Sequence, residues 1–374
     1  ASLLKQQGYT TAQMGKWGVR HDYSATVKPG KRPGHRDAYD FPNQRLLGSQ
    51  LVGFDYAWFM THLFPLPGKT KIGIYTKHLF ENGLPVDPDL EHSDPYRWLP
   101  DSANKVVEYL EVYSGEKQND AFGIEPDQPF FIYWDPPSPH TPIVPNEAFV
   151  GASGAGAYGD FVAEIDHYVG EMLDALDRLG LTENTLVVFT SDNGPERFCY
   201  ERIQEHQHYS MGDLRGVKRD LYDGGHRVPM IVRWPGVVEP GTTSNQLVGL
   251  IDWFATISDI TGQEVPDNAG EDSISILPLL RGERVANPLR TTHIHHTHQG
   301  QFAIRHNDWL YIDHAKGSSS PEPAWFRQEL GVQPHNAPAE LFNVKADPQL
   351  THNLYSKHPE KVKTLKRLLE QVRR

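Results

Sequence analysis

The sequence lacks several features that would place it in a particular class of protein. Its 374 residues include one cysteine, Cys199, which excludes internal disulfide bridges and cysteine-rich zinc sites. No apolar run approaches the roughly 18 residues that a membrane-spanning helix needs. The formal charge of −12 argues against a nucleic-acid partner, which would require a basic face. An anionic substrate must therefore be held by a local group of cations.

The start of the chain also lacks familiar signals. There is no initiator methionine and no basic segment before an apolar core, so we find no signal peptide. Residues 1–7 read instead as the end of an amphipathic helix that stops at Gly8. We expect that the chain begins partway through a domain.

Short apolar runs predict the strands. The segment 10–14 is expected to form a short strand, and the runs at 129–134, 185–190 and 229–234 are expected to form buried strands. The run at 129–134 is apolar throughout, which is typical of a strand covered on both faces.

Helical spacing of apolar residues predicts helices between these strands. One begins near Ser102, and others cover 158–179 and 245–262. The alternation predicts an α/β domain over 1–290, with a mainly parallel central sheet flanked by helices. Hairpin-like segments and a last helix predict a small C-terminal α+β subdomain over 291–374.

Polar side chains follow two of the predicted strands. His140 comes after the strand at 129–134, and Asp192 and Asn193 come directly after the strand at 185–190. Sites in parallel sheets form beyond the carboxyl ends of the strands. Oxygen ligands such as these suit calcium or magnesium. The alternatives are a capping turn, since Asn-Gly is a common turn dipeptide, and a surface histidine without a role.

Two lysines lie in glycine-rich surroundings. Lys16 follows a glycine in "GKWG", and Lys218 precedes a Gly-Gly pair. Each is either a solvated basic side chain or an ammonium group aimed at an anionic substrate oxygen. The histidine-rich segment 293–298 is best interpreted as a polar strand, with a role at an active-site rim as the alternative. A transition-metal site is least favoured, because no carboxylate or cysteine accompanies these histidines at ligand spacing.

Five motifs occur in an order that resembles the formylglycine-dependent sulfatases, arylsulfatase-like enzymes of the alkaline-phosphatase-like superfamily. They are "GYTTAQMGKWG", "PFFIYWDPPSPHTP", "TLVVFTSDNG", "LRGVKRDLYDGGHRVPMIVRWPG" and "ELFNVKADPQLTHNL". The resemblance covers nearly the whole chain. It implies an alkaline-phosphatase-like α/β fold and a sulfuric-ester hydrolase that acts on a sulfated carbohydrate or an aryl sulfate. It also implies a periplasmic or extracellular location.

The resemblance implies a role for each candidate residue. Asp192 and Asn193 would be two ligands of one calcium ion. Lys16 and Lys218 would bind sulfate oxygens, and His140 would hydrogen-bond the ester near its leaving oxygen. Such a set of groups would neutralise and position the sulfate while a proton donor helps the alcohol to leave.

Three departures from the family pattern stand out. Gly18 replaces a histidine of the Lys-Trp motif, and His21 is a candidate substitute. The family nucleophile is a formylglycine made from the cysteine or serine of a Cys/Ser-x-Pro-x-Arg motif. We expect this motif to be absent, since Cys199 is not followed by a proline and an arginine at the required spacing. The upstream acidic pair that completes the calcium site is absent too. We therefore expect a sulfatase lacking its N-terminal part, with no appreciable turnover and weak calcium binding.

Two other functions stay open. One is a non-catalytic relative that binds sulfated glycans, and the other is a phosphatase or phosphonate monoester hydrolase of the same superfamily. Zinc-dependent relatives commonly carry Asp-His where this chain has Asp-Asn, which favours calcium and sulfate. Four aromatic or histidine side chains could contact a sugar ring, although packing is the favoured interpretation: Trp58, His62, Trp98 and His206.

Overall fold

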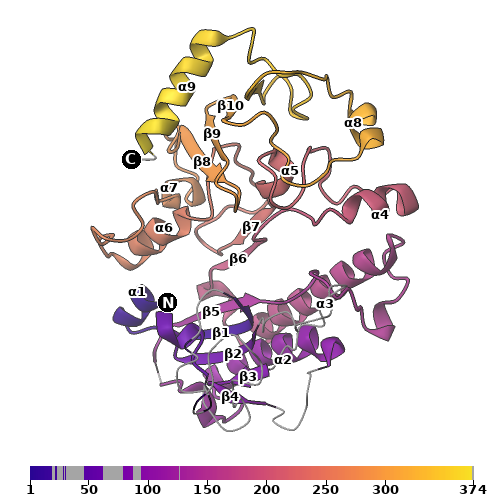
Figure 1. Cartoon of the computed structure of the whole chain (residues 1–374). Coiled ribbons are helices and arrows are strands. Elements are labelled where there is room, and N and C mark those ends of the chain that lie inside the picture. Colours follow the sequence, from indigo (N-terminus) through magenta and orange to yellow (C-terminus); the bar gives the residue numbers. More distant parts are fainter. Residues whose placement is uncertain are drawn as a thin grey trace. The chain divides into compact units, whose positions relative to one another are not determined.

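The computed structural model describes residues 1–18, 22, 28, 30, 46–61, 79–86, 94–125 and 127–372. The chain divides into two compact units, Ala1–Thr182 and Glu183–Arg374, which are described one at a time (Figure 1). Among the described helices, none combines the length and the apolar character that crossing a membrane requires.

The first unit is built on a five-stranded sheet in the order β4-β3-β2-β1-β5. β1 lies between β2 and β5 and runs parallel to both, whereas β3 and β4 join the edge as antiparallel strands. The predicted α/β class is confirmed, and the sheet is mixed because of this antiparallel edge. The strands are β1 (Thr10–Trp17), β2 (Tyr56–Thr61), β3 (Leu79–Glu81), β4 (Leu84–Pro85) and β5 (Phe130–Asp135).

Among the described residues of this unit, the α-helices that accompany the sheet are α1 (Ser2–Gln6), α2 (Pro95–Tyr113) and α3 (Gly156–Arg178). α2 packs against β1 and β5, and α3 packs against α2 (Figure 1). α2 begins before the predicted start at Ser102. The Asp94 side chain accepts a hydrogen bond from the Tyr96 amide, and Pro95 occupies the first turn, where it loses no hydrogen bond.

The prediction that the strand at 129–134 is covered on both faces is wrong. β1 is buried along almost its whole length, but the residues of β5 are half-buried or exposed, and Tyr133 is 47% exposed. The reason is the position of β5 in the sheet that the described residues form, where it stands at the end of the strand order and pairs with β1 on one side.

The second unit begins with an antiparallel pair, β6 (Val187–Thr190) and β7 (Met230–Arg233). α6 (Asp252–Thr261) ends at Gly262 as predicted, but it starts later than residue 245. The Asp252 carboxylate accepts hydrogen bonds from the Gly249 and Ile274 amides and pairs with the buried Arg290. These contacts hold Asp252 at the beginning of the helix.

A four-stranded antiparallel sheet in the order β11-β10-β9-β8 follows in the same unit. α9 packs on β9 and β10 through the buried side chains of Val362, Leu365 and Leu369. This is the predicted C-terminal α+β part, and its predicted boundary at residue 290 stays a prediction. The remaining elements are α4 (Cys199–His206), α5 (Asp223–His226), α7 (Leu277–Leu280), β8 (Thr292–His296), β9 (Phe302–His306), β10 (Trp309–Ile312), α8 (Ala324–Leu330), β11 (Glu340–Asn343) and α9 (Pro359–Val372).

Candidate active site

Lys16 lies near the carboxyl end of β1 in the first unit. The neighbouring Gly15 pairs with Asp135 in the β1–β5 register. Gly15 has φ of +131°, and a Cβ at this position would lie 2.1 Å from the Asp135 carbonyl oxygen. A glycine is therefore needed for the two strands to approach this closely. The β1–β5 ladder ends at this Gly15–Asp135 pair, and Lys16 is the next residue of β1.

His140 lies in the turn that follows β5. Its amide donates to the Pro137 carbonyl, and its Nδ1 lies 2.8 Å from the Thr141 carbonyl oxygen. A carbonyl only accepts hydrogen bonds, so the neutral ring keeps its proton on Nδ1. The Nε2 atom is then an acceptor that becomes a donor when the imidazole is protonated.

The segment after His140 is anchored to α3. The amide and the side chain of Asn146 both donate to Glu164, at 2.9 and 2.6 Å. Glu164 has no solvent exposure, so these hydrogen bonds are needed to stabilise its buried carboxylate.

In the second unit, Asp192 and Asn193 form the turn after β6. Asp192 is exposed and Asn193 is half-buried, and the Asn193 Nδ2 atom lies 3.0 Å from the Asp192 Oδ1 atom. The next residue, Gly194, donates its amide to the Gly225 carbonyl at 3.0 Å. A Cβ on Gly194 would lie 1.8 Å from the Gly224 carbonyl oxygen. This turn therefore requires a glycine directly after the two candidate ligands.

The same turn is hydrogen-bonded to the loop that carries Lys218. The Lys218 amide donates to the Pro195 carbonyl at 2.8 Å. The second unit thus brings together three of the predicted site residues, Asp192, Asn193 and Lys218. The backbone segments that carry the candidate cation and the two candidate metal ligands are therefore joined by a hydrogen bond.

Buried side chains on either side of Lys218 hold its loop. Asp220 accepts hydrogen bonds from the Val217, Ser319 and Ser320 amides. Burial nevertheless raises the pKa of Asp220 to about 6. Arg215 makes a two-pronged ion pair with Glu322, in which both N···O distances are 2.9 Å and both side chains are buried.

Asp192 and Asn193 offer the oxygen atoms that calcium prefers. Their side chains converge, so both oxygens can reach one ion after rotation of the Asn193 amide. Calcium takes six or more ligands, and the described ranges contain no group of three or more His, Cys, Asp or Glu side chains arranged to hold a metal. The donor type therefore fits calcium, but these two residues are only part of a shell.

Three of the residues proposed to contact a sugar can be assessed. Trp58 and Trp98 are 2% and 6% exposed, so both are packing residues. His206 ends α4 and is exposed. His62 and the candidate His21 lie outside the described residues.

The histidine-rich segment is not the plain polar strand that the sequence predicts. His293 and His295 share one face of β8, and the His295 ring lies 3.7 Å from that of His226 between ring centroids. Nε2 atoms of His226 and His295 both face the Leu221 carbonyl, at 3.3 and 3.1 Å. Burial lowers the pKa of His226 to about 4 and that of His295 to about 3. His226 and His295 are therefore neutral packing residues, and both contact the Leu221 carbonyl.

The expectation that the nucleophile pattern is absent from the chain is wrong. Ser93-Asp-Pro-Tyr-Arg97 fits Ser-x-Pro-x-Arg. Ser93 lies outside the described residues, while Pro95 begins α2 and Arg97 pairs with Asp101 at 3.0 Å. The pattern follows the Lys-Trp motif along the chain, whereas the resemblance places the nucleophile before it.

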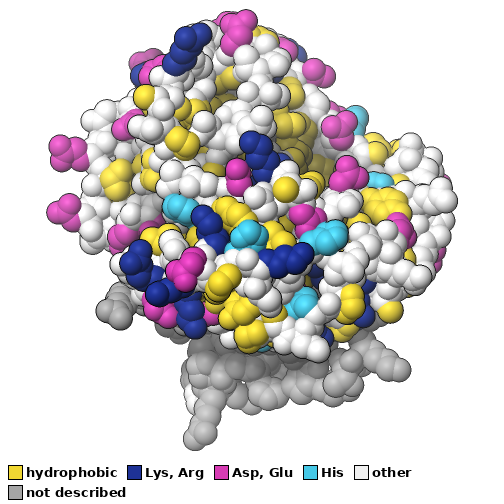
Figure 2. All heavy atoms as spheres, turned by 90° about the horizontal axis from the view of Figure 1, so that it is seen from above, with side chains coloured by type: hydrophobic (Ala, Val, Ile, Leu, Met, Phe, Trp, Pro, Cys, Tyr) yellow, Lys and Arg dark blue, Asp and Glu magenta, His cyan; other side chains and the backbone are white. Residues whose placement is uncertain are grey.

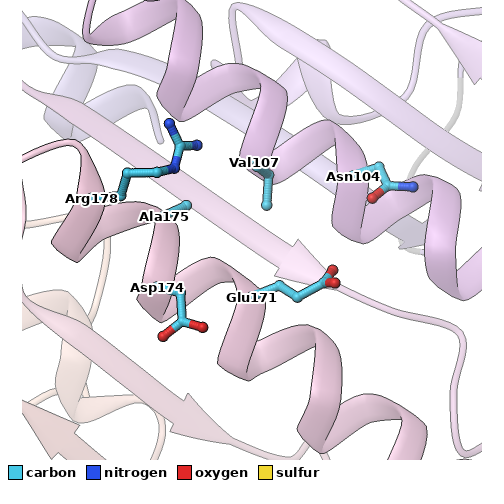
Figure 3. A pocket seen from close by; sticks show the side chains of 6 residues that line it. All are labelled: Asn104, Val107, Glu171, Asp174, Ala175 and Arg178. Carbon is cyan, nitrogen blue, oxygen red and sulfur yellow. The ribbon is translucent and has the colours of Figure 1, made fainter.

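A shallow pocket lies between α2 and α3 on the first unit (Figure 3). Its lining includes Glu171, Asp174 and Arg178. The Arg178 guanidinium pairs with Glu111 and Glu116, at 2.8 and 2.5 Å. The charge of Arg178 is therefore already neutralised, and Glu171 and Asp174 place two carboxylates on the pocket wall. This pocket is unsuited to an anion.

Charged side chains of both signs lie on the surface, in keeping with the mixed composition. Figure 2 shows a face on which Lys, Arg and His side chains lie among Asp, Glu and hydrophobic side chains.

Comparison with known proteins decides the family. A model described as "Sulfatase" matches residues 1–263, and one described as "N-sulphoglucosamine sulphohydrolase, C-terminal" matches residues 215–314. The chain belongs to the sulfatase family. This is a family of enzymes that hydrolyse sulfuric esters.

Relatives named for sulfated carbohydrates are among the matches. An N-acetylgalactosamine-6-O-sulfatase of Bacteroides thetaiotaomicron is 29% identical over all of this chain and 76% of its own length. An N-acetylgalactosamine-6-sulfatase of Rattus norvegicus is 31% identical over 77% of this chain, which spans about half (49%) of that protein.

A solved structure from work on the metabolism of multiple glycosaminoglycans by Bacteroides thetaiotaomicron superposes with a TM-score of 0.74 and 27% identity. The superposition covers 99% of this chain and 81% of that chain. The alkaline-phosphatase-like α/β fold that the resemblance implied is thereby confirmed.

Proposed function

We propose that the protein is a sulfatase directed at sulfate esters of carbohydrates, that its substrate is a 6-O-sulfated N-acetylgalactosamine, and that residues 1–374 by themselves have no appreciable turnover. The observation that carries this proposal is the hydrogen-bonded pairing of the Asp192–Asn193 turn with the Lys218 loop. It joins the backbone that carries two hard oxygen ligands to the loop that carries a lysine, which supports recognition of a sulfate anion by these residues. The relatives named for N-acetylgalactosamine 6-sulfate support the sugar.

Each candidate residue has a proposed role. Lys16 and Lys218 bind sulfate oxygens, and their charges offset the charge of the ester. His140 hydrogen-bonds the ester near its leaving oxygen. The Thr141 carbonyl holds Nδ1 as a donor, so in the protonated imidazole Nε2 gives the departing alcohol the proton it needs and the ring becomes neutral.

Asp192 and Asn193 would hold a calcium ion as two of its oxygen ligands. A bound calcium ion would supply fixed positive charge that polarises the sulfate group. His21 stays a candidate for contact with the sulfate in place of the residue at Gly18. A periplasmic or extracellular location is part of the same proposal.

The predicted lack of turnover can be tested on the chain itself. We expect no appreciable hydrolysis of an aryl sulfate and weak binding of calcium by the purified chain. Measurable hydrolysis would contradict this expectation, and a Ser93→Ala variant would then show whether the Ser-x-Pro-x-Arg pattern is responsible.

The proposed substrate is tested by calorimetry with three ligands: N-acetylgalactosamine 6-sulfate, its 6-phosphate analogue and the unmodified sugar. We expect the order of affinity sulfate, phosphate, unmodified sugar. Stronger binding of the phosphate would favour a phosphatase or phosphonate monoester hydrolase.

A further inference from the structure

Lys218 occupies the second position of a tight turn in the second unit. The Asp220 amide donates to the Val217 carbonyl at 2.9 Å, and the Asp220 carboxylate accepts from the Val217 amide at 2.9 Å. These two hydrogen bonds close the turn across Lys218 and Arg219. Arg219, at the third position, has φ of +79°. A positive φ at this position is typical of type II turns, in which glycine is the usual residue because a side chain strains the backbone.

The Arg219 side chain makes an ion pair outside its own turn. Its Nη1 atom donates to both carboxylate oxygens of Glu196, at 3.0 and 2.8 Å. The Arg197 amide also donates to the Glu196 Oε1 atom, at 3.0 Å. Partial burial of Glu196 opposes its ionisation, but these hydrogen bonds outweigh burial, and the pKa of Glu196 is lowered. The pair is therefore formed between two charged groups.

Glu196 belongs to the backbone segment that carries the candidate metal ligands. It follows Asn193 closely in the sequence, and the Pro195 carbonyl between them accepts from the Lys218 amide at 2.8 Å. The turn of Lys218 and the segment of Asn193 are thus joined twice, once through the backbone and once through the Arg219–Glu196 pair. The second connection involves the residue whose backbone is strained.

Close packing limits how this turn can relax. A Cβ on Gly225 would lie 2.5 Å from the Val217 carbonyl oxygen and 2.7 Å from that of Asp220, so the turn cannot move as a whole toward Gly225. The relaxation open to it is a flip of the peptide between Lys218 and Arg219, which converts a type II turn into a type I turn and gives the third residue a negative φ. The flip also changes ψ of Lys218, and side-chain rotamers depend on the backbone angles.

We propose that Arg219 is a positioning residue for Lys218: its ion pair with Glu196 holds the turn in the type II form and so keeps the lysine in the rotamers that let its ammonium reach a sulfate. This inference rests on the proposed function of Lys218. It explains why a strained arginine stands next to a candidate sulfate ligand, since a glycine would fit the turn but would leave it free to flip.

The test measures the affinity of the full chain for inorganic sulfate by calorimetry at constant ionic strength. Glu196→Gln is the decisive variant, because charge and position predict opposite results. The Glu196 carboxylate and the Lys218 ammonium act on each other electrostatically, so removal of the negative charge alone would raise sulfate affinity. Loss of the pair should instead lower the affinity by about two- to fivefold, the range that an exposed ion pair can contribute.

Variants of the arginine complete the comparison. Arg219→Gln removes the other member of the pair and should also lower sulfate affinity, whereas Arg219→Lys keeps a cation opposite Glu196 and should bind sulfate more tightly than Arg219→Gln. Because Glu196→Gln and Arg219→Gln break the same contact, the double variant should bind sulfate no more weakly than Arg219→Gln alone. Arg281→Gln and Glu283→Gln are the matched controls, since they change an exposed pair of the same unit, and both should leave the affinity unchanged.

Urea denaturation separates a change in position from a change in stability. The Arg219 side chain is 42% exposed and that of Glu196 is 29% exposed, so the midpoint of denaturation should stay close to that of the unchanged chain in both single variants. A lower sulfate affinity at an unchanged midpoint is the result that a merely structural role would not give. Glu196→Ala makes the same change of charge and takes the place of Glu196→Gln if that protein does not fold.

Lys218→Met separates this inference from the proposed function. If that variant does not lower sulfate affinity, the role proposed for Lys218 fails, and the positioning role of Arg219 fails with it. If Lys218→Met lowers the affinity but Glu196→Gln raises it or leaves it unchanged, the positioning role alone is overturned. The same conclusion follows if Glu196→Gln lowers the affinity by the same factor in the Arg219→Gln protein as in the unchanged chain.

Discussion

The two candidate sulfate-binding lysines are held in different ways. Lys16 belongs to β1, and its backbone is fixed by parallel ladders with β2 and β5. Lys218 lies on a loop that is fixed by side chains, namely the Asp220 carboxylate and the Arg215–Glu322 ion pair. In a strand ladder, many backbone hydrogen bonds share in holding the chain. In the buried ionic network, a few side chains hold it, so a single side-chain substitution should destabilise the Lys218 loop more than the Lys16 strand.

The largest effect is expected from breaking the buried pair beneath the Lys218 loop. Arg215→Met would leave Glu322 buried without its partner and would free the Leu350 carbonyl, which accepts from Arg215 at 2.7 Å. Loss of one member of a buried pair costs about 3–5 kcal/mol. Urea denaturation should show this decrease in the free energy of unfolding of the second unit. A change below about 1 kcal/mol would show that the network does not support the loop.

The next effect concerns the close approach of β1 and β5. Gly15→Ala would place a methyl group 2.1 Å from the Asp135 carbonyl oxygen at a φ of +131°. We expect a loss of roughly 2–4 kcal/mol in the free energy of unfolding of the first unit, from backbone strain and overpacking. Gly8→Ala is the control, since Gly8 also has a positive φ but no heavy atom within 4 Å of the added Cβ, and should cost about 1 kcal/mol. Equal losses in the two variants would refute the packing explanation.

Acid should weaken the second unit through the adjacent rings of His226 and His295. In the folded protein, the pKa values of His226 and His295 are lowered to about 4 and about 3, whereas unfolded histidine titrates near 6.5. The unfolded chain thus binds more protons, so this stability is present above about pH 6.5 and is lost as pH falls toward 4 and 3. The loss for one such group is on the order of 3 kcal/mol.

Denaturation at several pH values checks this effect, with His295→Asn as the variant. Asparagine keeps a donor for the Leu221 carbonyl but does not titrate, so the dependence of stability on pH should become shallower. The groups that face these rings are His293, Asp223 and Arg305, and they are unchanged in the variant. An unaltered pH dependence would contradict the burial of a neutral histidine pair.

The smallest effect is expected next to Lys218 itself. Arg219 pairs with Glu196 at 2.8 Å, but the arginine side chain is 42% exposed. Exposed ion pairs contribute below about 1 kcal/mol and are screened by salt. Arg219→Gln should therefore barely change the free energy of unfolding in urea, in contrast to Arg215→Met. A loss comparable to that of Arg215→Met would remove the distinction between buried and exposed support.

The sequence reveals strands and helices where local signals are strong. The long helix predicted at 158–179 forms as α3, and the apolar runs at 185–190 and 229–234 contain β6 and β7. Their pairing could not be predicted from these runs, because strand partners depend on contacts far apart in the chain. The exposure of Tyr133 was missed for the same reason, since an apolar run does not show that its strand lies at a sheet edge.

The candidate residues themselves are recognisable from motifs, but their supports are not. Asp135 follows a strand and precedes two prolines, which gives no sign of its contact with Gln13. Likewise, Glu322 lies far from Arg215 in the sequence, and only the fold brings the two side chains together. Gln13 could have indicated such a contact, since it is a polar residue within a buried strand. A buried amide must find hydrogen-bond partners.

The most direct test of the central claim is a calorimetric titration of the full chain with N-acetylgalactosamine 6-sulfate. We expect Lys16→Met and Lys218→Met each to lower the affinity by about tenfold or more, equivalent to about 1.4 kcal/mol. Lys363→Met, at an exposed position of α9, should leave it unchanged. Equal affinity in all four proteins would contradict the proposal that these two lysines bind the sulfate group.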